Sequence, residues 1–149
     1  MNRKLFIAAL VFANAAFAQQ AGEDLSGKSA RKLTKDETQQ LLSGADTSSV
    51  FGNGNQYTME YKSDGSIAGY QYSRGGKGGM ASRGETWAIT GSWIVSDDGQ
   101  VCREYKVINP RASTDYKNCP FVLRLADGRL VYSSSGDVSG RATVFEIKK

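Results

Sequence analysis

Apolar and polar residues alternate with a period of two after Tyr57, and this alternation limits the possible folds more than any other feature of the chain. The clearest example spans residues 86–96, where the odd positions hold Trp87, Ile89, Gly91, Trp93 and Val95. Because successive side chains of a strand point to opposite faces, this segment predicts a strand with one buried face. Gly91 interrupts the buried row and indicates a bend of the kind found in small barrels.

Three Asp-Gly corners separate the alternating segments, at residues 63–65, 97–99 and 126–128. A two-residue loop at 98–99 would set Cys102, Glu104 and Lys106 opposite the apolar row. A three-residue loop with a left-handed Gly99 keeps one face apolar and sends Cys102 to the other face. It pairs Val95 with Val101, Trp93 with Arg103, Gly91 with Tyr105 and Ile89 with Val107. The same loop at the other corners pairs Tyr61 with Ile67, Met59 with Gly69 and Leu123 with Val131.

These strands predict an all-β domain with one short helix. A last strand is expected from Arg141 to Ile147, which makes seven or eight strands over about 90 residues without intervening helices. We expect a small antiparallel meander barrel, lipocalin-like, because successive hairpins need no long crossover; a β-sandwich is the alternative. The aromatic residues expected to fill the core or line a cavity are Tyr57, Tyr61, Trp87, Trp93 and Tyr105, and a chain of this size favours a filled interior.

The segment before the strands predicts one helix and a lead-in. Thr34 and Glu37 have the spacing of a capping box, and Gly44 is a suitable helix end, which predicts about two turns. Residues 19–33 are polar and lack periodicity, so we expect a flexible lead-in. Residues 34–149 then form a single domain.

Residues 1–18 have the pattern of a secretory signal peptide. Arg3 and Lys4 precede an apolar stretch, and Ala16 and Ala18 fit a cleavage site between Ala18 and Gln19. The alternative, a retained anchor, is disfavoured because the apolar stretch is shorter than the roughly 20 residues that span a bilayer. We therefore expect a periplasmic or secreted protein without a transmembrane span. Cleavage lowers the formal charge from +4 to +2, which gives no reason to expect a nucleic-acid partner.

The two cysteines, Cys102 and Cys119, predict a disulfide bond, since an exported chain enters an oxidising compartment. The alternative is a pair of free or metal-binding thiols, for which two ligands without close spacing are too few.

The chain contains no His, which excludes triads that use His and zinc sites that contain it. The acidic residues lie at turns or on solvent-facing positions, and no pair has a spacing that indicates glycoside hydrolysis. We therefore predict no catalytic residues, no metal site and no cofactor.

Residues 73–84 form a glycine-rich segment that contains no acidic residue. Its three cations are Arg74, Lys77 and Arg83. It lacks the Ser or Thr that follows the lysine of a phosphate-binding loop, so a mobile loop between strands is the simpler interpretation. The alternative is an anionic partner that docks on the three cations. Tyr70 and Tyr72 have the opposite parity from Ile67 and are expected outside the barrel. These three cations and two tyrosines are the candidate partner-binding residues.

Several short motifs occur in order: residues 41–44 (Leu-Leu-Ser-Gly), 61–65 (Tyr-Lys-Ser-Asp-Gly), 91–95 (Gly-Ser-Trp-Ile-Val), 98–102 (Asp-Gly-Gln-Val-Cys) and Cys119. In these the chain resembles a family of small secreted proteobacterial proteins that has no assigned activity. The resemblance covers about half of the chain and implies location and fold rather than a reaction.

Two functions follow as hypotheses. The first is an exported, non-enzymatic binding module that holds a protein partner, such as an enzyme to be inhibited. The alternative is a lipocalin-like carrier of a small apolar ligand, which requires an internal cavity of about 300 Å³ or more.

Overall fold

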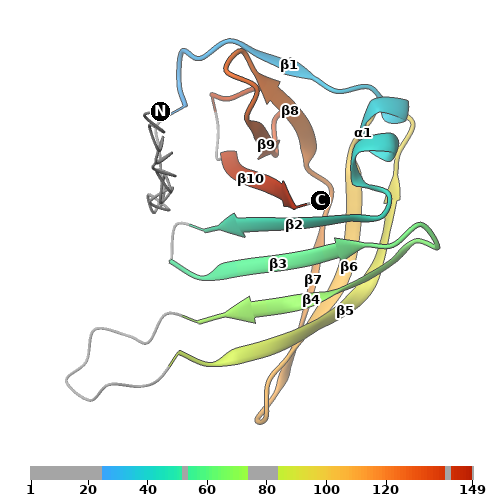
Figure 1. The fold of residues 1–149 in the computed structure, drawn as a ribbon, viewed down its shortest axis with the longest axis vertical. Coiled ribbons are helices and arrows are strands. Elements are labelled where there is room, and N and C mark those ends of the chain that lie inside the picture. Colours follow the sequence, from blue (N-terminus) through green and yellow to red (C-terminus); the bar gives the residue numbers. More distant parts are fainter. Residues whose placement is uncertain (1–24, 52–53, 74–83, 140–141, 149) are drawn as a thin grey trace, which may run out of the picture.

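The computed structural model describes residues 25–51, 54–73, 84–139 and 142–148. Within these ranges the chain forms ten strands and one helix (Figure 1). The elements are β1 (Ala30–Lys32), α1 (Lys35–Leu42), β2 (Ala45–Val50), β3 (Gln56–Tyr61), β4 (Ser66–Tyr72), β5 (Thr86–Val95), β6 (Val101–Ile108), β7 (Ser113–Asn118), β8 (Phe121–Leu125), β9 (Leu130–Ser133) and β10 (Ala142–Lys148). The predicted all-β class with one short helix is confirmed.

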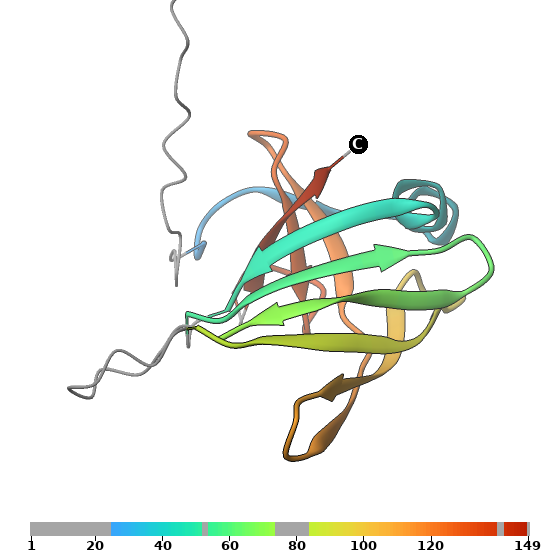
Figure 2. The ribbon, with the colours of Figure 1, turned by 60° about the horizontal axis from the view of Figure 1, so that its bottom comes forward.

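All ten strands belong to one antiparallel sheet, in the order β1-β8-β9-β10-β2-β3-β4-β5-β6-β7, which curls into a half-barrel (Figure 2). Arg103 of β6 faces Asn118 of β7, and Gln100 faces Phe121 of β8, so β7 and β8 follow β6 in one continuous register. β8 then leaves β6 and pairs with β9. The chain therefore passes directly from one edge of the sheet to the strand next to its other edge.

The predicted hairpin registers are confirmed at all three Asp-Gly corners. The corner glycines Gly65, Gly99 and Gly128 have φ values of 84°, 87° and 88°, the left-handed region that only glycine enters without strain. Ser96 and Gln100 close the second corner through a backbone hydrogen bond of 2.9 Å. Trp87 and Trp93 consequently lie on the same, inner face of β5.

The disulfide bond between Cys102 and Cys119 is present, with an S–S distance of 2.11 Å. Cys102 alternates with the buried residues Val101 and Arg103, so the bond lies on the outer face, as the three-residue corner predicts. It joins β6 to the two-residue link between β7 and β8, at the point where the continuous strand changes partner.

Part of the predicted flexible lead-in is integrated into the fold instead. β1 pairs with β8, and Leu25 and Leu33 are 3% and 1% exposed. The physical reason is that β8 has two apolar faces: Val122 packs into the barrel core, and its neighbour Leu123 packs into a second cluster with Leu25. Leu25 therefore covers the outer face of β8, whereas Leu33 packs into the barrel core.

The helix begins and ends where its caps predict. The Thr34 hydroxyl accepts from the Glu37 N–H, and the Glu37 carboxylate accepts from the Thr34 N–H at 2.9 Å. Arg31 of β1 donates to both oxygens of the Glu37 carboxylate, and these hydrogen bonds lower the pKa of Glu37 to about 2. With Leu42 fully buried, α1 covers one end of the barrel and is held to β1 through Glu37.

Candidate functional site

The five aromatic residues predicted for the core or a cavity all belong to the barrel core. Tyr57, Tyr61, Trp93 and Tyr105 are buried, and Trp87 packs against them while partly exposed. Tyr61 and Trp93 meet edge to face at 5.3 Å between ring centroids. The Trp93 indole N–H donates to the Lys62 carbonyl at 2.9 Å. The five residues thus belong to one hydrophobic cluster inside the barrel.

Arg103 enters this core as a buried cation, 6% exposed. Its Nη1 donates to the Tyr61 hydroxyl at 3.0 Å, and its Nε donates to the Asn118 side-chain oxygen at 2.9 Å. The guanidinium lies 4.6 Å from the centre of the Tyr132 ring. Burial alone lowers the pKa of Arg103, but the neighbouring Tyr61 and Tyr132 outweigh it and raise the pKa. Tyrosine oxygens, an amide and a ring face thus stabilise the charge.

The Tyr132 hydroxyl completes this cluster, at 3.1 Å from the Tyr61 hydroxyl. Burial raises the pKa of Tyr132 well above its usual value of 10, so the hydroxyl stays protonated at neutral pH. The sequence pairing placed Arg103 opposite Trp93, but nothing in the sequence indicated that Tyr132, far along the chain, stacks on the guanidinium. The cluster thus joins Arg103, Tyr61, Tyr132 and Asn118 inside the core.

The outer surface of the barrel carries an uncharged row of side chains across four strands. Thr58, Tyr70, Ala88 and Ile108 are consecutive partners from β3 to β6. A second uncharged row, next to the first, contains Gln56, Tyr72 and Thr86. We call these seven residues the tyrosine face. Three of its side chains are large and exposed: Tyr70 at 52%, Ile108 at 44% and Tyr72 at 42%.

Charged residues border the tyrosine face on one side. The adjacent row runs from Asp46 through Glu60 to Lys106 and Asp115. Between the two rows is a hollow of about 460 Å³, whose lining includes Tyr70 and the small residues Ala68, Gly69 and Ala88. An exposed aromatic ring beside a shallow hollow with a polar rim is a common composition for a protein-binding surface.

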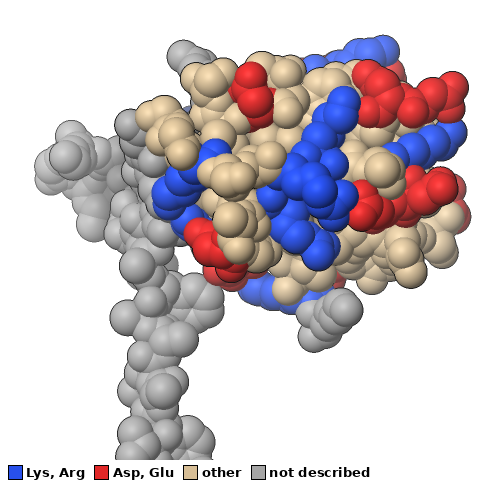
Figure 3. Space-filling view, turned by 90° about the horizontal axis from the view of Figure 1, so that it is seen from above, with Lys and Arg blue, Asp and Glu red and all other residues tan. Residues whose placement is uncertain are grey.

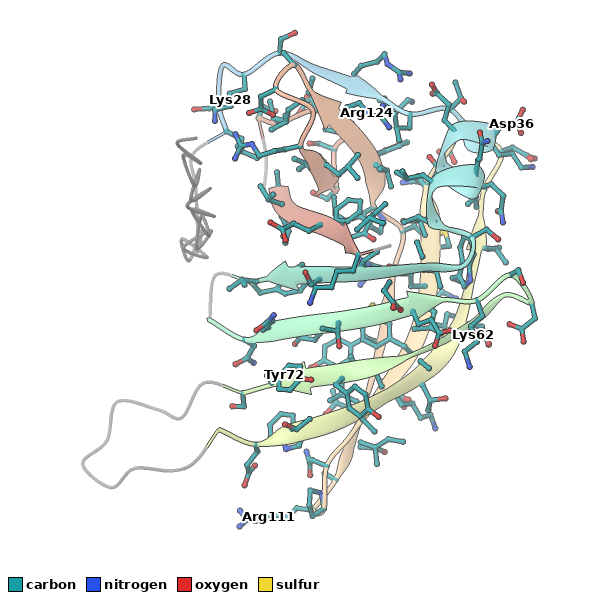
Figure 4. The ribbon with its side chains drawn as sticks, viewed as in Figure 1. Lys28, Asp36, Lys62, Tyr72, Arg111 and Arg124 are labelled. Atoms are coloured by element: carbon teal, nitrogen blue, oxygen red, sulfur yellow. A yellow bond between two sulfur atoms is a disulfide. The ribbon has the colours of Figure 1, made fainter. Side chains whose placement is uncertain are left out.

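The exposure predicted for Tyr70 and Tyr72 is confirmed, and Figure 4 shows Tyr72 near the end of β4. The other three candidates, Arg74, Lys77 and Arg83, lie outside the described residues. The contribution of Ile108 and Ala88 to the same face was not recognised in the sequence. The signal was present, because the predicted pairing of Ile89 with Val107 also sets Ala88 opposite Ile108.

A second hollow, of about 700 Å³, lies between α1 and the end of β10. Its lining includes Leu41 and Ile147, the cations Arg124 and Lys148, and the acid Glu37. Figure 3, which views the molecule from above, shows Lys and Arg near the middle of the surface and Asp and Glu in several separate patches around them. Both signs of charge thus occur in the lining of this hollow.

The described residues contain no group of three or more His, Cys, Asp or Glu side chains that could hold a metal ion. Within the same part of the chain, no helix has the length and apolar character needed to cross a membrane. The predicted leader, residues 1–18, with its cleavage site lies outside the described ranges.

Comparison with known proteins does not assign a function to these surfaces. Comparison of the chain with protein-family models, curated proteins and solved structures found no match.

Proposed function

We propose that the protein is an exported, non-enzymatic binding module whose tyrosine face contacts a protein partner in the periplasm or outside the cell. The observation that carries the proposal is the uncharged outer face with exposed Tyr70, Tyr72 and Ile108. Tyrosine side chains supply large contact areas at a low entropy cost and are enriched at interfaces. Strands hold these residues in place, so little backbone ordering is needed on binding.

The disulfide bond supports the exported location, because such bonds persist in oxidising compartments. The contact between Tyr61 and Trp93 supports surface binding, because these are two of the rings that would line an internal cavity. An exported enzyme that the module inhibits is one partner of this kind.

Site-specific photo-crosslinking in the cell envelope of the host tests the proposal. A photoreactive residue at position 70 or 72 is expected to capture a discrete protein, and excess unlabelled wild-type protein is expected to abolish the capture. The matched control is position 94, because Ile94 is 67% exposed on the same strand as Ala88 but lies outside the tyrosine face. Equal capture from position 94, or none from positions 70 and 72, would contradict the proposal.

Carriage of a small apolar ligand is the second candidate, and one buried residue favours it. Gln71 is 3% exposed, between Tyr57 and Trp87 in the sheet register, and its Oε1 has no hydrogen-bond partner among the described residues. A ligand donor would satisfy this oxygen. Native mass spectrometry separates the two functions: a retained small molecule, lost on Gln71→Leu substitution, would support the carrier.

A further inference from the structure

The edge strand β7 has no partner on one side among the described residues. It pairs with β6 only, and its side chains are exposed except for the partly buried Asn118. Figures 1 and 2 show the β6-β7 hairpin extending beyond the rest of the barrel, and Figure 4 shows Arg111 at its tip. Unpaired strand edges present N–H and C=O groups that bind a further strand.

The hydrogen-bond pattern identifies which backbone groups face the free side. The Val101 N–H donates to the Pro120 carbonyl at 2.9 Å, so residue 120 directs its backbone toward β6. Because direction alternates along an antiparallel strand, residues 118, 116 and 114 do the same. The outward backbone groups therefore belong to Ser113, Asp115, Lys117 and Cys119. Beyond Cys119, β9 occupies this side, since Phe121 pairs with Ser133.

The free stretch, residues 113–119, is centred on Tyr116 and is complementary to itself. If two copies pair antiparallel about a two-fold axis at Tyr116, each outward residue meets an outward residue. Asp115 then lies opposite Lys117 of the second copy, and Ser113 lies opposite Cys119. Registers centred on Asp115 or Lys117 would instead set identical charges directly opposite each other, which is unfavourable.

Existing ion pairs extend this complementarity across β6. Lys117 is paired with Glu104, and Asp115 lies 3.7 Å from Lys106. In the two-fold pairing, acids and bases alternate through both copies. On the other face Tyr116, 38% exposed, stacks on Tyr105 with 5.2 Å between ring centroids. The two Tyr116 rings would meet at the axis as a directly opposite pair.

We propose that the protein forms a symmetric dimer through β7, in which two copies pair antiparallel about Tyr116 and continue one sheet into the other. The occupant of the free edge is a second copy of this chain, because length, hydrogen-bond direction and charge all match in one register. This dimer does not depend on the proposed function of the tyrosine face.

Sedimentation velocity over a range of concentrations tests the proposal. The mass of the wild-type protein is expected to rise from that of the monomer to that of the dimer as concentration increases. The dimer is expected to be weak, as is typical of a small interface. The variants Asp115→Lys and Lys117→Asp each place like charges opposite one another and are expected to remain monomeric. An equimolar mixture of the two variants sets Lys opposite Asp again and is expected to restore the twofold mass.

The mixture distinguishes a lost interface from a lost fold, because misfolded variants would not recombine into a dimer. Lys62→Asp, the same charge change on the β3-β4 hairpin, is expected to leave the dimer intact. A wild-type protein that stays monomeric at all concentrations would overturn the proposal. Dimers that persist in each single variant would assign the contact to another surface and would overturn it as well.

Discussion

Tyr57 shows how burial changes the acidity of a tyrosine hydroxyl. Its side chain is 8% exposed in the barrel core, where its ring contacts Phe51 edge to face at 4.6 Å. Burial raises the pKa of Tyr57 to about 12, and the nearby Tyr116 and Tyr105 contribute in the same direction. The unfolded chain, in contrast, exposes this hydroxyl to water, where it ionises near pH 10.

This difference predicts a loss of stability at alkaline pH. Below pH 10 both states keep the Tyr57 proton; between about pH 10 and 12 only the unfolded state releases it, so the free energy of unfolding falls. We expect Tyr57→Phe to make this fall shallower, as measured by urea denaturation at about pH 8 and pH 11. Tyr70→Phe, which changes an exposed tyrosine, is the matched control. An unchanged slope in Tyr57→Phe would show that the buried hydroxyl does not drive the alkaline loss.

At the scale of the hairpins, the three corner glycines share the same left-handed backbone conformation but have different neighbours. A Cβ added at Gly99 would lie 2.9 Å from the Leu33 carbonyl oxygen, whereas one added at Gly128 meets nothing within 4 Å. The corner of β5 and β6 therefore packs against the chain just before α1, and that of β8 and β9 is open to solvent. Only the tertiary contact distinguishes the two corners.

We expect Gly99→Ala to destabilise the protein more than Gly128→Ala. Both substitutions cost about 1 to 2 kcal/mol for a side chain at positive φ. Gly99→Ala additionally pushes Leu33, 1% exposed, away from the core. Urea denaturation of both variants measures the difference in unfolding free energy. Equal losses would mean that the Leu33 segment moves aside freely.

At the scale of the whole molecule, the chain runs continuously from β7 at one edge of the sheet into β8 next to the other edge, and the disulfide bond fixes this path to β6. β1 then pairs with β8, and Leu25 packs on the outer face of β8. The strands β8, β9 and β10 each contribute side chains to both apolar clusters.

Removal of the disulfide bond is expected to lower the unfolding free energy by about 3 kcal/mol, the chain-entropy value for a loop of this length. The double substitution Cys102→Ser and Cys119→Ser tests this by urea denaturation, with the two single substitutions as controls. We expect the folded circular-dichroism spectrum to persist, because the β6-β7 ladder remains hydrogen-bonded. A double variant as stable as the wild type would show that the ladder alone fixes the strand.

The sequence by itself determined the helix at Thr34 and Glu37, the three corners and the registers beside them, because capping, positive φ and period-two alternation act between residues close in the chain. Only the tertiary structure decided the strands β1, β2 and β7, whose polar residues carry no alternating apolar pattern. The same holds for the Arg103 cluster and for the full extent of the tyrosine face. Their formation depends on partners contributed by distant strands, and no local pattern encodes which distant strand will lie alongside.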